Sequence, residues 1–161
     1  MQTWKKATLI VVLVGTLFLT AALVLRGAGD PSGDGPKLAG PSQMQINTSD
    51  GLSMCLVERS GAHFALRFEN QTGEDAVIGW GCALEKMENS VWYALESEDV
   101  AFTAEGYVIP AGGTLDWEED VGYFGRDLAA GEYRIVKPAY CGVAEDGTSR
   151  RLILAAEFIV E

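Results

Sequence analysis

The chain of 161 residues contains three cysteines, Cys55, Cys82 and Cys141, and a single histidine, His63. Structural zinc sites and redox dithiols need cysteines paired at short spacing, and no two of these form a C-x-x-C pair. The spacing therefore argues against zinc and against a thioredoxin-like activity. His63 has no Ser, Cys or Asp beside it in the sequence with which to form a nucleophile–base pair.

Other catalytic motifs are missing as well. The chain contains no G-x-S-x-G, no glycine-rich phosphate loop and no H-E-x-x-H. With 23 Asp and Glu residues, a pair of carboxylates assembled by the fold stays open as an alternative. We predict a protein that is not an enzyme, and we assign no catalytic residue and no cofactor.

One acidic run has the right atoms for a hard cation. Residues 116–120, Asp-Trp-Glu-Glu-Asp, with Asp127 nearby, offer carboxylate oxygens of the kind that bind Ca²⁺. The run lacks the D-x-[DN]-x-[DN]-G spacing of an EF-hand loop. A solvated acidic loop is the simpler interpretation, and we assign no metal ligand.

Aromatic side chains are the remaining candidates for a binding site. Aromatic faces stack on sugar rings and anchor protein interfaces, so Trp80, Tyr107 and Tyr123 are the predicted ligand-facing residues. The alternative is a structural role, because sandwich cores also bury one or two tryptophans.

The N-terminus carries a membrane signal. Residues 1–6 contain two lysines and no acid, residues 7–25 carry no charge, and Arg26 follows. Nineteen helical residues span about 28 Å, close to the thickness of the bilayer core. A cleaved signal peptide is the alternative, but the apolar run continues past Ala22, and Arg26 stands where a small residue is needed. We predict an uncleaved transmembrane signal anchor at 7–26, with residues 1–6 in the cytoplasm and the rest outside.

Charge and composition divide residues 27–161 into a linker and a folded domain. Residues 27–161 contain nine of the 12 Lys and Arg and all 23 acids, which gives 9 − 23 = −14. Such acidity argues against nucleic acid as a partner and predicts repulsion from an anionic membrane surface. Residues 27–43 are rich in Gly, Pro and Ser and have no apolar periodicity, so they are predicted to be a flexible linker. The folded domain is predicted to occupy 44–161.

Short apolar or alternating runs separated by turn residues follow along this domain. In residues 63–68, Phe64, Leu66 and Phe68 alternate with less apolar residues, which is typical of a half-buried strand. The predicted strands are 52–57, 63–68, 76–80, 82–86, 91–95, 114–117, 131–136 and 151–159. Helix is limited to at most a turn around 121–126. Seven or eight antiparallel strands predict an all-β, immunoglobulin-like sandwich.

One local pattern supports this fold. Residues 128–135, Leu-Ala-Ala-Gly-Glu-Tyr-Arg-Ile, have the layout of a tyrosine corner at the start of an F strand. We expect the hydroxyl of Tyr133 to bond a backbone group a few residues upstream. The Cys that follows two positions later in immunoglobulin domains is here Ile135.

Residues 52–160 resemble the bacterial Ig-like domains of membrane-anchored or lipid-anchored envelope proteins. The pieces that carry the resemblance, in order, are 66–70, 84–86, 92–93, 101–102, 107–112, Trp117, 123–125, 131–137 and 155–158. The resemblance implies the fold and an envelope location, and it brings no catalytic residues. Many such proteins carry a lipid-modified Cys, which this chain lacks after its apolar run.

In an Ig-like sheet the C and F strands are neighbours. A disulfide is possible outside the membrane, and Cys82 with Cys141 is then the preferred pair; the alternative is three unpaired thiols. The odd number of cysteines leaves at least one thiol free in either case.

The predicted function follows from these parts. We expect a single-pass membrane protein whose extracytoplasmic Ig-like domain has a non-enzymatic binding or scaffolding role, with an envelope protein or glycan as partner. The alternatives are an accessory subunit that regulates a membrane-embedded sensor or enzyme, and a passive stalk. The fold cannot choose among them.

Overall fold

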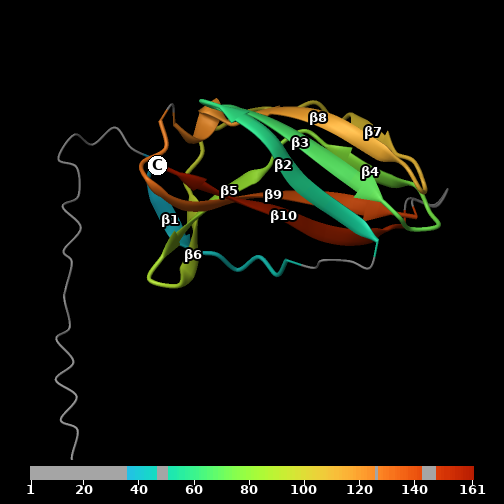
Figure 1. Cartoon of the computed structure of the whole chain (residues 1–161), viewed down its shortest axis with the longest axis horizontal. Helices are drawn as coiled ribbons and strands as arrows, with labels where there is room; N and C mark the ends of the chain where they lie inside the picture. The colour runs from blue at the N-terminus through green and yellow to red at the C-terminus, as the bar shows by residue number, and fades with distance from the viewer. Residues whose placement is uncertain (1–35, 47–50, 126, 143–147) are drawn as a thin grey trace, which may run out of the picture. The chain divides into compact units, whose positions relative to one another are not determined.

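A computed structural model of the chain describes residues 36–46, 51–125, 127–142 and 148–161 (Figure 1). Within these ranges ten β-strands and one short 3₁₀ helix form two antiparallel sheets. The strands are β1 (Leu38–Pro41), β2 (Leu52–Ser60), β3 (His63–Asn70), β4 (Ala76–Gly79), β5 (Ala83–Glu88), β6 (Val91–Leu95), β7 (Gly106–Ile109), β8 (Thr114–Asp120), β9 (Gly131–Cys141) and β10 (Arg150–Val160), and the helix is η1 (Gly122–Phe124). The predicted all-β sandwich is confirmed.

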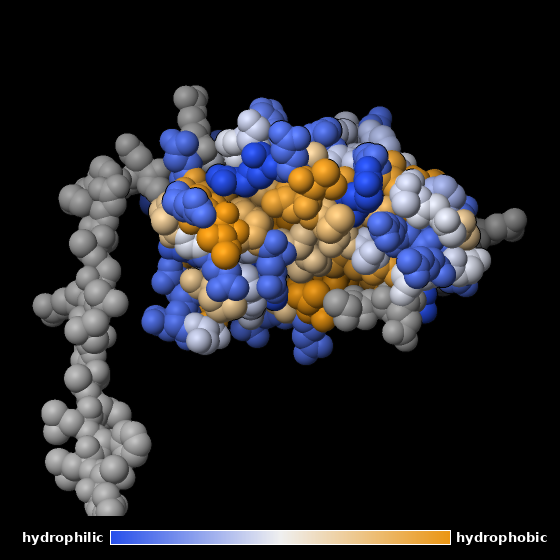
Figure 2. All heavy atoms as spheres, viewed as in Figure 1, coloured by the Kyte–Doolittle hydropathy of each residue, from blue (hydrophilic) through white to orange (hydrophobic). Residues whose placement is uncertain are grey.

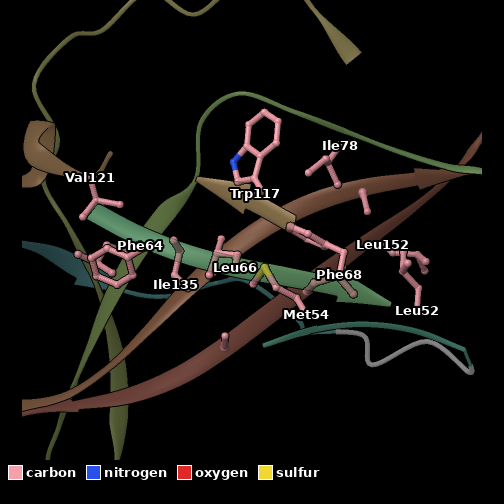
Figure 3. Packing of buried hydrophobic residues seen from close by; sticks show 14 of the residues in the cluster. Leu52, Met54, Phe64, Leu66, Phe68, Ile78, Trp117, Val121, Ile135 and Leu152 are labelled. Atoms are coloured by element: carbon pink, nitrogen blue, oxygen red, sulfur yellow. The ribbon is translucent and has the colours of Figure 1, made fainter. Parts of the chain in front are cut away.

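The smaller sheet has the order β2-β3-β8. Its central strand follows the predicted alternation, because Phe64, Leu66 and Phe68 are buried while the residues between them are exposed or half-buried. Successive side chains of a strand point to opposite faces, so this spacing places all three on the inner face. Figure 3 shows them packed with Trp117 of β8 and Ile135 of β9 in the core between the sheets.

The larger sheet is organised around β9. β10 pairs with β9 along its whole length, from Gly131 to Cys141. A strand has only two edges, so β5 and β4 share the other one. β5 pairs with residues 133–136 of β9, and β4 pairs with residues 139–141. β6 and β1 continue the sheet beyond β5, and β7 continues it beyond β4.

The shared edge is interrupted between β4 and β5. Ile78 pairs with Ala139 and Ala83 pairs with Val136, so residues 79–82 lie where β9 has only residues 137 and 138. Two extra residues must leave the plane of the sheet. Pro138 fits this position, because it has no N–H to donate to a neighbouring strand. We refer to Trp80, Gly81 and Cys82 as the 80–82 bulge.

The predicted tyrosine corner is present. Tyr133 is buried, and its hydroxyl donates a 2.8 Å hydrogen bond to the carbonyl oxygen of Ala129. This bond fixes the chain where it enters β9. The predicted turn near residues 121–126 is confirmed too, as the helix η1.

Two strands were not predicted, so the number of strands is ten instead of seven or eight. β7 lies between the predicted strands 91–95 and 114–117, where no strand was predicted. β1 lies inside 27–43, the segment predicted to be a linker, where Leu38 pairs with Leu95 of β6. β1 escapes prediction because a four-residue strand at the edge of a sheet needs no apolar alternation and tolerates Pro41 at its end.

The membrane prediction concerns residues outside the described part of the chain. The predicted anchor at 7–26 and residues 27–35 of the linker are not among the described residues. Within the described ranges, no helix is long and apolar enough to cross a bilayer.

Candidate functional site

A buried lysine holds the 80–82 bulge from inside the sandwich. Gly81 has a φ of +86°, a region that favours glycine, and its carbonyl oxygen accepts a 2.9 Å hydrogen bond from the Nζ of Lys137. The bulge removes this carbonyl from the regular ladder. The lysine therefore satisfies a backbone group that would otherwise lack a partner.

Lys137 is itself neutralised by a buried acid. Its Nζ also donates to Oε2 of Glu119, and both side chains are almost fully inaccessible to solvent. The same oxygen accepts a 2.8 Å bond from the indole Nε1 of Trp117. Lys137 lies 5.3 Å from the centroid of the Trp117 ring. A charge this deep is tolerated only with such partners.

Sequence reasoning missed this pair, although a signal existed. In β9 the inward positions are 133, 135, 137, 139 and 141, so Lys137 falls on the core face. In β8 the inward residues are 115, 117 and 119, which places Glu119 beside Trp117. A lysine and a glutamate at core positions of two strands predict an ion pair, provided that the strands are recognised to face each other.

Cys82, the last residue of the bulge, contacts Tyr123. The Sγ of Cys82 lies 3.1 Å from the Tyr123 hydroxyl, which also accepts a 3.3 Å bond from the Cys82 N–H. Burial, followed by the nearby Glu119 carboxylate, raises the pKa of the Cys82 thiol to about 12. Burial also raises the pKa of Tyr123. Because nucleophilic cysteines react as thiolates, a protonated thiol of this kind is a structural group.

Trp80, Tyr107 and Trp117 form an aromatic cluster, which is joined to the buried ion pair through the bond from Trp117 to Glu119. The ring of Trp117 is 4.6 Å from those of Trp80 and Tyr107, and Trp80 and Tyr107 are 5.8 Å apart with nearly perpendicular planes. Trp117 is buried, whereas Trp80 is 40% exposed. The exposed indole therefore stands on a rigid support, which is how aromatic anchors of interfaces are presented.

Two hollows adjoin Trp80. The first is lined by Trp80, Val100, Phe102, Glu119, Asp120, Gly122 and Tyr123. Phe102 is 45% exposed and packs edge-on against Tyr123 at 5.5 Å. The second is lined by Met44, Trp80, Gly81, Cys82, Ala83, Val136, Pro138, Arg151 and Ile153. Trp80 thus contributes to two concave surfaces.

The three predicted ligand-facing aromatics lie in one region of the domain. Trp80 and Tyr123 line the first hollow. Tyr107 is half-buried and packs against Trp80 and Trp117, and its hydroxyl donates a 3.1 Å bond to Glu105. Tyr107 therefore supports the surface that Trp80 presents. Phe102, which sequence reasoning placed only within a family pattern, belongs to this surface as well.

The candidate disulfide between Cys82 and Cys141 is not formed, and the structure agrees with the alternative of three free thiols. Cys82 precedes Ala83, which pairs with Val136, so it lies near the position opposite Lys137 of β9. Cys141 is four residues further along β9, about 13 Å away along the strand. A disulfide needs Cα atoms within about 7 Å. β4 and β5, on either side of Cys82, both pair with β9, but the register keeps Cys82 and Cys141 apart.

The acidic run at 116–120 does not converge on one point. Asp116 pairs with Arg67 at 2.7 Å, and this contact lowers the pKa of Asp116. Glu119 points into the core, and Asp120 accepts the Gly122 N–H at 2.8 Å. Alternation along β8 sends these carboxylates to opposite faces. Within the described ranges, no three Asp, Glu, His or Cys side chains are grouped so as to hold a metal ion.

The single histidine lies at the surface. The Nδ1 of His63 is 3.9 Å from Oδ2 of Asp120, and both side chains are mostly exposed. General bases work best where water is excluded and a reacting group is within reach. His63 and Asp120 are open to water instead, so we assign this pair no catalytic role.

A second buried ion pair lies on the opposite, outer face of the larger sheet. Glu85 and Arg134 are cross-strand neighbours, with Arg134 Nε 2.6 Å from Glu85 Oε2. The guanidinium lies 4.4 Å from the centroid of the Trp92 ring, and the hydroxyl of Ser42 donates to the other oxygen of Glu85. These contacts fasten the segment that follows β1 to the outer face.

An apolar groove lies between the edge strands β2 and β10. It is lined by Ile46, Met54, Cys55, Leu56, Arg134, Ala155, Ala156 and Glu157. Figure 2 shows apolar residues gathered on this side of the molecule, over the region where Figure 1 shows β2 and β10. The bulge in β2 between Leu56 and Glu58 interrupts its regular edge.

Residues 51–158 match the family model of the bacterial Ig-like domain. This match covers β2 to β9 completely and β10 up to Phe158. No curated protein matches the chain.

Proposed function

The chain belongs to the family of bacterial Ig-like domains, and from this premise we propose that it is a non-enzymatic binding domain of the bacterial cell envelope whose ligand contacts the surface around Trp80. An anchor at residues 7–26 would hold it in the membrane, with the domain on the extracytoplasmic side. Ig-like sandwiches host many functions, so the choice rests on the site.

The exposure of Trp80 is the observation that carries this proposal. A tryptophan that is 40% exposed contributes a large apolar surface to solvent. The 80–82 bulge that presents it is fixed from below by Lys137, and the ring packs against Trp117 and Tyr107. Holding an aromatic ring ready in this way lowers the entropy lost on binding.

Crosslinking in cells tests the proposal. The full-length protein, tagged at its C-terminus, is crosslinked and its partners are identified by mass spectrometry. We expect Trp80→Ala to abolish capture of a reproducible partner. Ile159→Ala is the matched control, because Ile159 is an apolar side chain 74% exposed elsewhere on the domain. Capture that survives Trp80→Ala contradicts the proposal.

Replacing residues 7–25 with an unrelated transmembrane segment provides a second arm. A binding domain keeps its partner after the replacement. Loss of the partner would instead favour an accessory subunit that acts through the membrane helix. Cell fractionation of the same variants, with protease added from outside, tests the predicted location of the domain.

A further inference from the structure

The first hollow beside Trp80 combines three aromatic rings with a negative rim. Trp80, Phe102 and Tyr123 contribute the rings, and Asp120 contributes an exposed carboxylate. The carboxylate of Glu119 also lines the hollow but is already neutralised by Lys137. The volume is about 360 Å³, near the lower end of the range for ligand pockets of about 300–1,000 Å³. This size suits one side chain better than an extended glycan.

Six of the seven residues that line the hollow belong to one acidic stretch of the chain. Residues 87–125 contain nine Asp and Glu and no Lys, Arg or His. The connection between β6 and β7 is exposed and carries four of these acids, Glu96, Glu98, Asp99 and Glu105. Lys37 lines a different hollow together with Glu96 and Glu98, and Arg151 lines the second hollow beside Trp80. Among the residues that the structure describes, no Lys or Arg lines the first hollow.

The protein already binds two of its own cations with one tryptophan face and one carboxylate. Lys137 lies over Trp117 and pairs with Glu119. Arg134 lies over Trp92 and pairs with Glu85. The ring quadrupole attracts the cation, and the carboxylate supplies the opposite charge. Trp80 and Asp120 bring the same two kinds of group to the first hollow, where none of the described lining residues is a cation. Asp120 also lies 3.9 Å from the Nδ1 of His63 and accepts the Gly122 N–H.

We propose that the hollow formed by Trp80, Phe102, Tyr123 and Asp120 binds a Lys or Arg side chain from a basic segment of a partner protein. The proposal rests on the proposed function, since it names the partner of the same surface. The acids around the hollow attract a basic segment and speed its association. They repel anionic membranes and anionic polymers for the same reason.

Peptide binding tests the proposal directly. The full-length protein in mild detergent is immobilised by its C-terminal tag. Two synthetic peptides are compared, both built on a Gly/Ser backbone, one with Lys and Arg at regular positions and one with Glu at the same positions. We expect the basic peptide to bind, with an affinity that falls as salt rises, and the acidic peptide not to bind. Equal binding of both peptides overturns the proposal.

Substitutions of residues that line the first hollow test whether the basic peptide binds there. Trp80→Ala should weaken binding of the basic peptide by at least about tenfold. Asp120→Asn should weaken it several-fold, while its remaining Oδ1 still accepts the Gly122 N–H. Ile159→Ala and Glu69→Gln are controls, because both side chains are exposed elsewhere on the domain. Urea unfolding establishes that each variant is folded. Unchanged binding by folded Trp80→Ala or Asp120→Asn overturns the proposed site.

The two proposals fail separately. If a partner is captured in cells through Trp80 but the basic peptide does not bind, the ligand class is wrong and the binding surface stands. If Trp80→Ala leaves capture in cells unchanged, the proposed function itself fails. Binding of free spermidine as tight as that of the peptide would contradict a protein partner.

Discussion

The Nζ of Lys137 donates a hydrogen bond to the carbonyl oxygen of Gly81 at 2.9 Å. One end of this contact lies in the core, where Lys137 pairs with Glu119, and the other belongs to the bulge that presents Trp80. The buried ion pair and the exposed indole are therefore parts of one arrangement. A substitution at Lys137 or Glu119 in the core should therefore change the conformation of the 80–82 bulge at the surface.

Lys137→Met tests this coupling. The variant leaves the Glu119 carboxylate buried without a counter-charge and the Gly81 carbonyl without its donor. We expect the free energy of unfolding to fall by about 3–5 kcal/mol. Urea denaturation measures the loss. The double variant Lys137→Met/Glu119→Gln removes both charges and keeps an acceptor for Trp117, so it should be more stable than Lys137→Met alone. A double variant as unstable as the sum of the two single ones would show that the pair is not coupled.

Gly81→Ala tests the conformation of the bulge. Gly81 has a φ of +86°, and an added Cβ would lie 3.2 Å from the ring of Phe102. The left-handed backbone alone costs about 1–2 kcal/mol with a side chain. We expect a loss of stability of that size and a changed tryptophan emission spectrum, because Phe102 must shift. Gly40→Ala is the control, since its Cβ would meet nothing within 4 Å. Equal effects of the two substitutions would contradict the assigned role of Gly81.

The buried thiol of Cys82 predicts a loss of stability in alkali. The folded protein keeps the proton until about pH 12, whereas the unfolded chain, with an ordinary pKa of 9.0, releases it. The unfolded state binds fewer protons above pH 9, so stability is full below that pH and falls as the pH rises toward 12. The slope is at most about 1.4 kcal/mol per pH unit. Chemical denaturation from pH 8 to 10 should give a flatter profile for Cys82→Ala than for the wild type or for Cys55→Ala. If stability fell equally with pH in all three proteins, the alkaline loss could not be assigned to Cys82.

Thiol labelling checks the state of the three cysteines. Cys55 is exposed, Cys82 is mostly buried and Cys141 is buried. We expect iodoacetamide to modify Cys55 in the folded protein and all three cysteines in urea, as counted by intact mass. Two cysteines that resist labelling in urea without reductant, but not with it, would restore the disulfide hypothesis.

Tyr133→Phe removes the hydroxyl that bonds the Ala129 carbonyl. The net value of such a bond is about 0.5–1.5 kcal/mol, and we expect stability to fall by that amount. Tyr140→Phe is the control, because Tyr140 lies exposed on the outer face of the same strand. A tyrosine corner is not supported if both substitutions have the same effect on the urea midpoint.

The alternation of Phe64, Leu66 and Phe68 made β3 predictable, and the layout around Tyr133 made the corner predictable. Both signals are local, because one depends on the period of a strand and the other on a contact four residues apart. The end of β9 was not predictable in the same way. The apolar run stops at Val136, yet the strand continues to Cys141 with a lysine and a proline in its middle.

The candidate site was predicted only in part. Exposed aromatics are a compositional signal, and Trp80 was found by it. The partners that position Trp80 are 18 and 56 residues apart along the chain, as the Lys137–Glu119 and Lys137–Gly81 contacts show. Contacts of this range depend on which strands face each other. Sequence periodicity does not contain that information. The candidate cysteine pair failed for a related reason, because the fold class does not give the register between neighbouring strands.

The order of contacts along the chain also has a mechanical consequence. Among the described strands β1 is paired with β6 alone, in an irregular register. The N–H of Ser42 then donates to the Trp92 carbonyl at 2.7 Å. A pulling force applied from the N-terminal side therefore loads β1 first and the Ser42–Glu85–Arg134 contacts second. The chain that leads into β2 is pulled directly only after both have yielded. The short edge strand is thus the element from which unpairing under tension would begin.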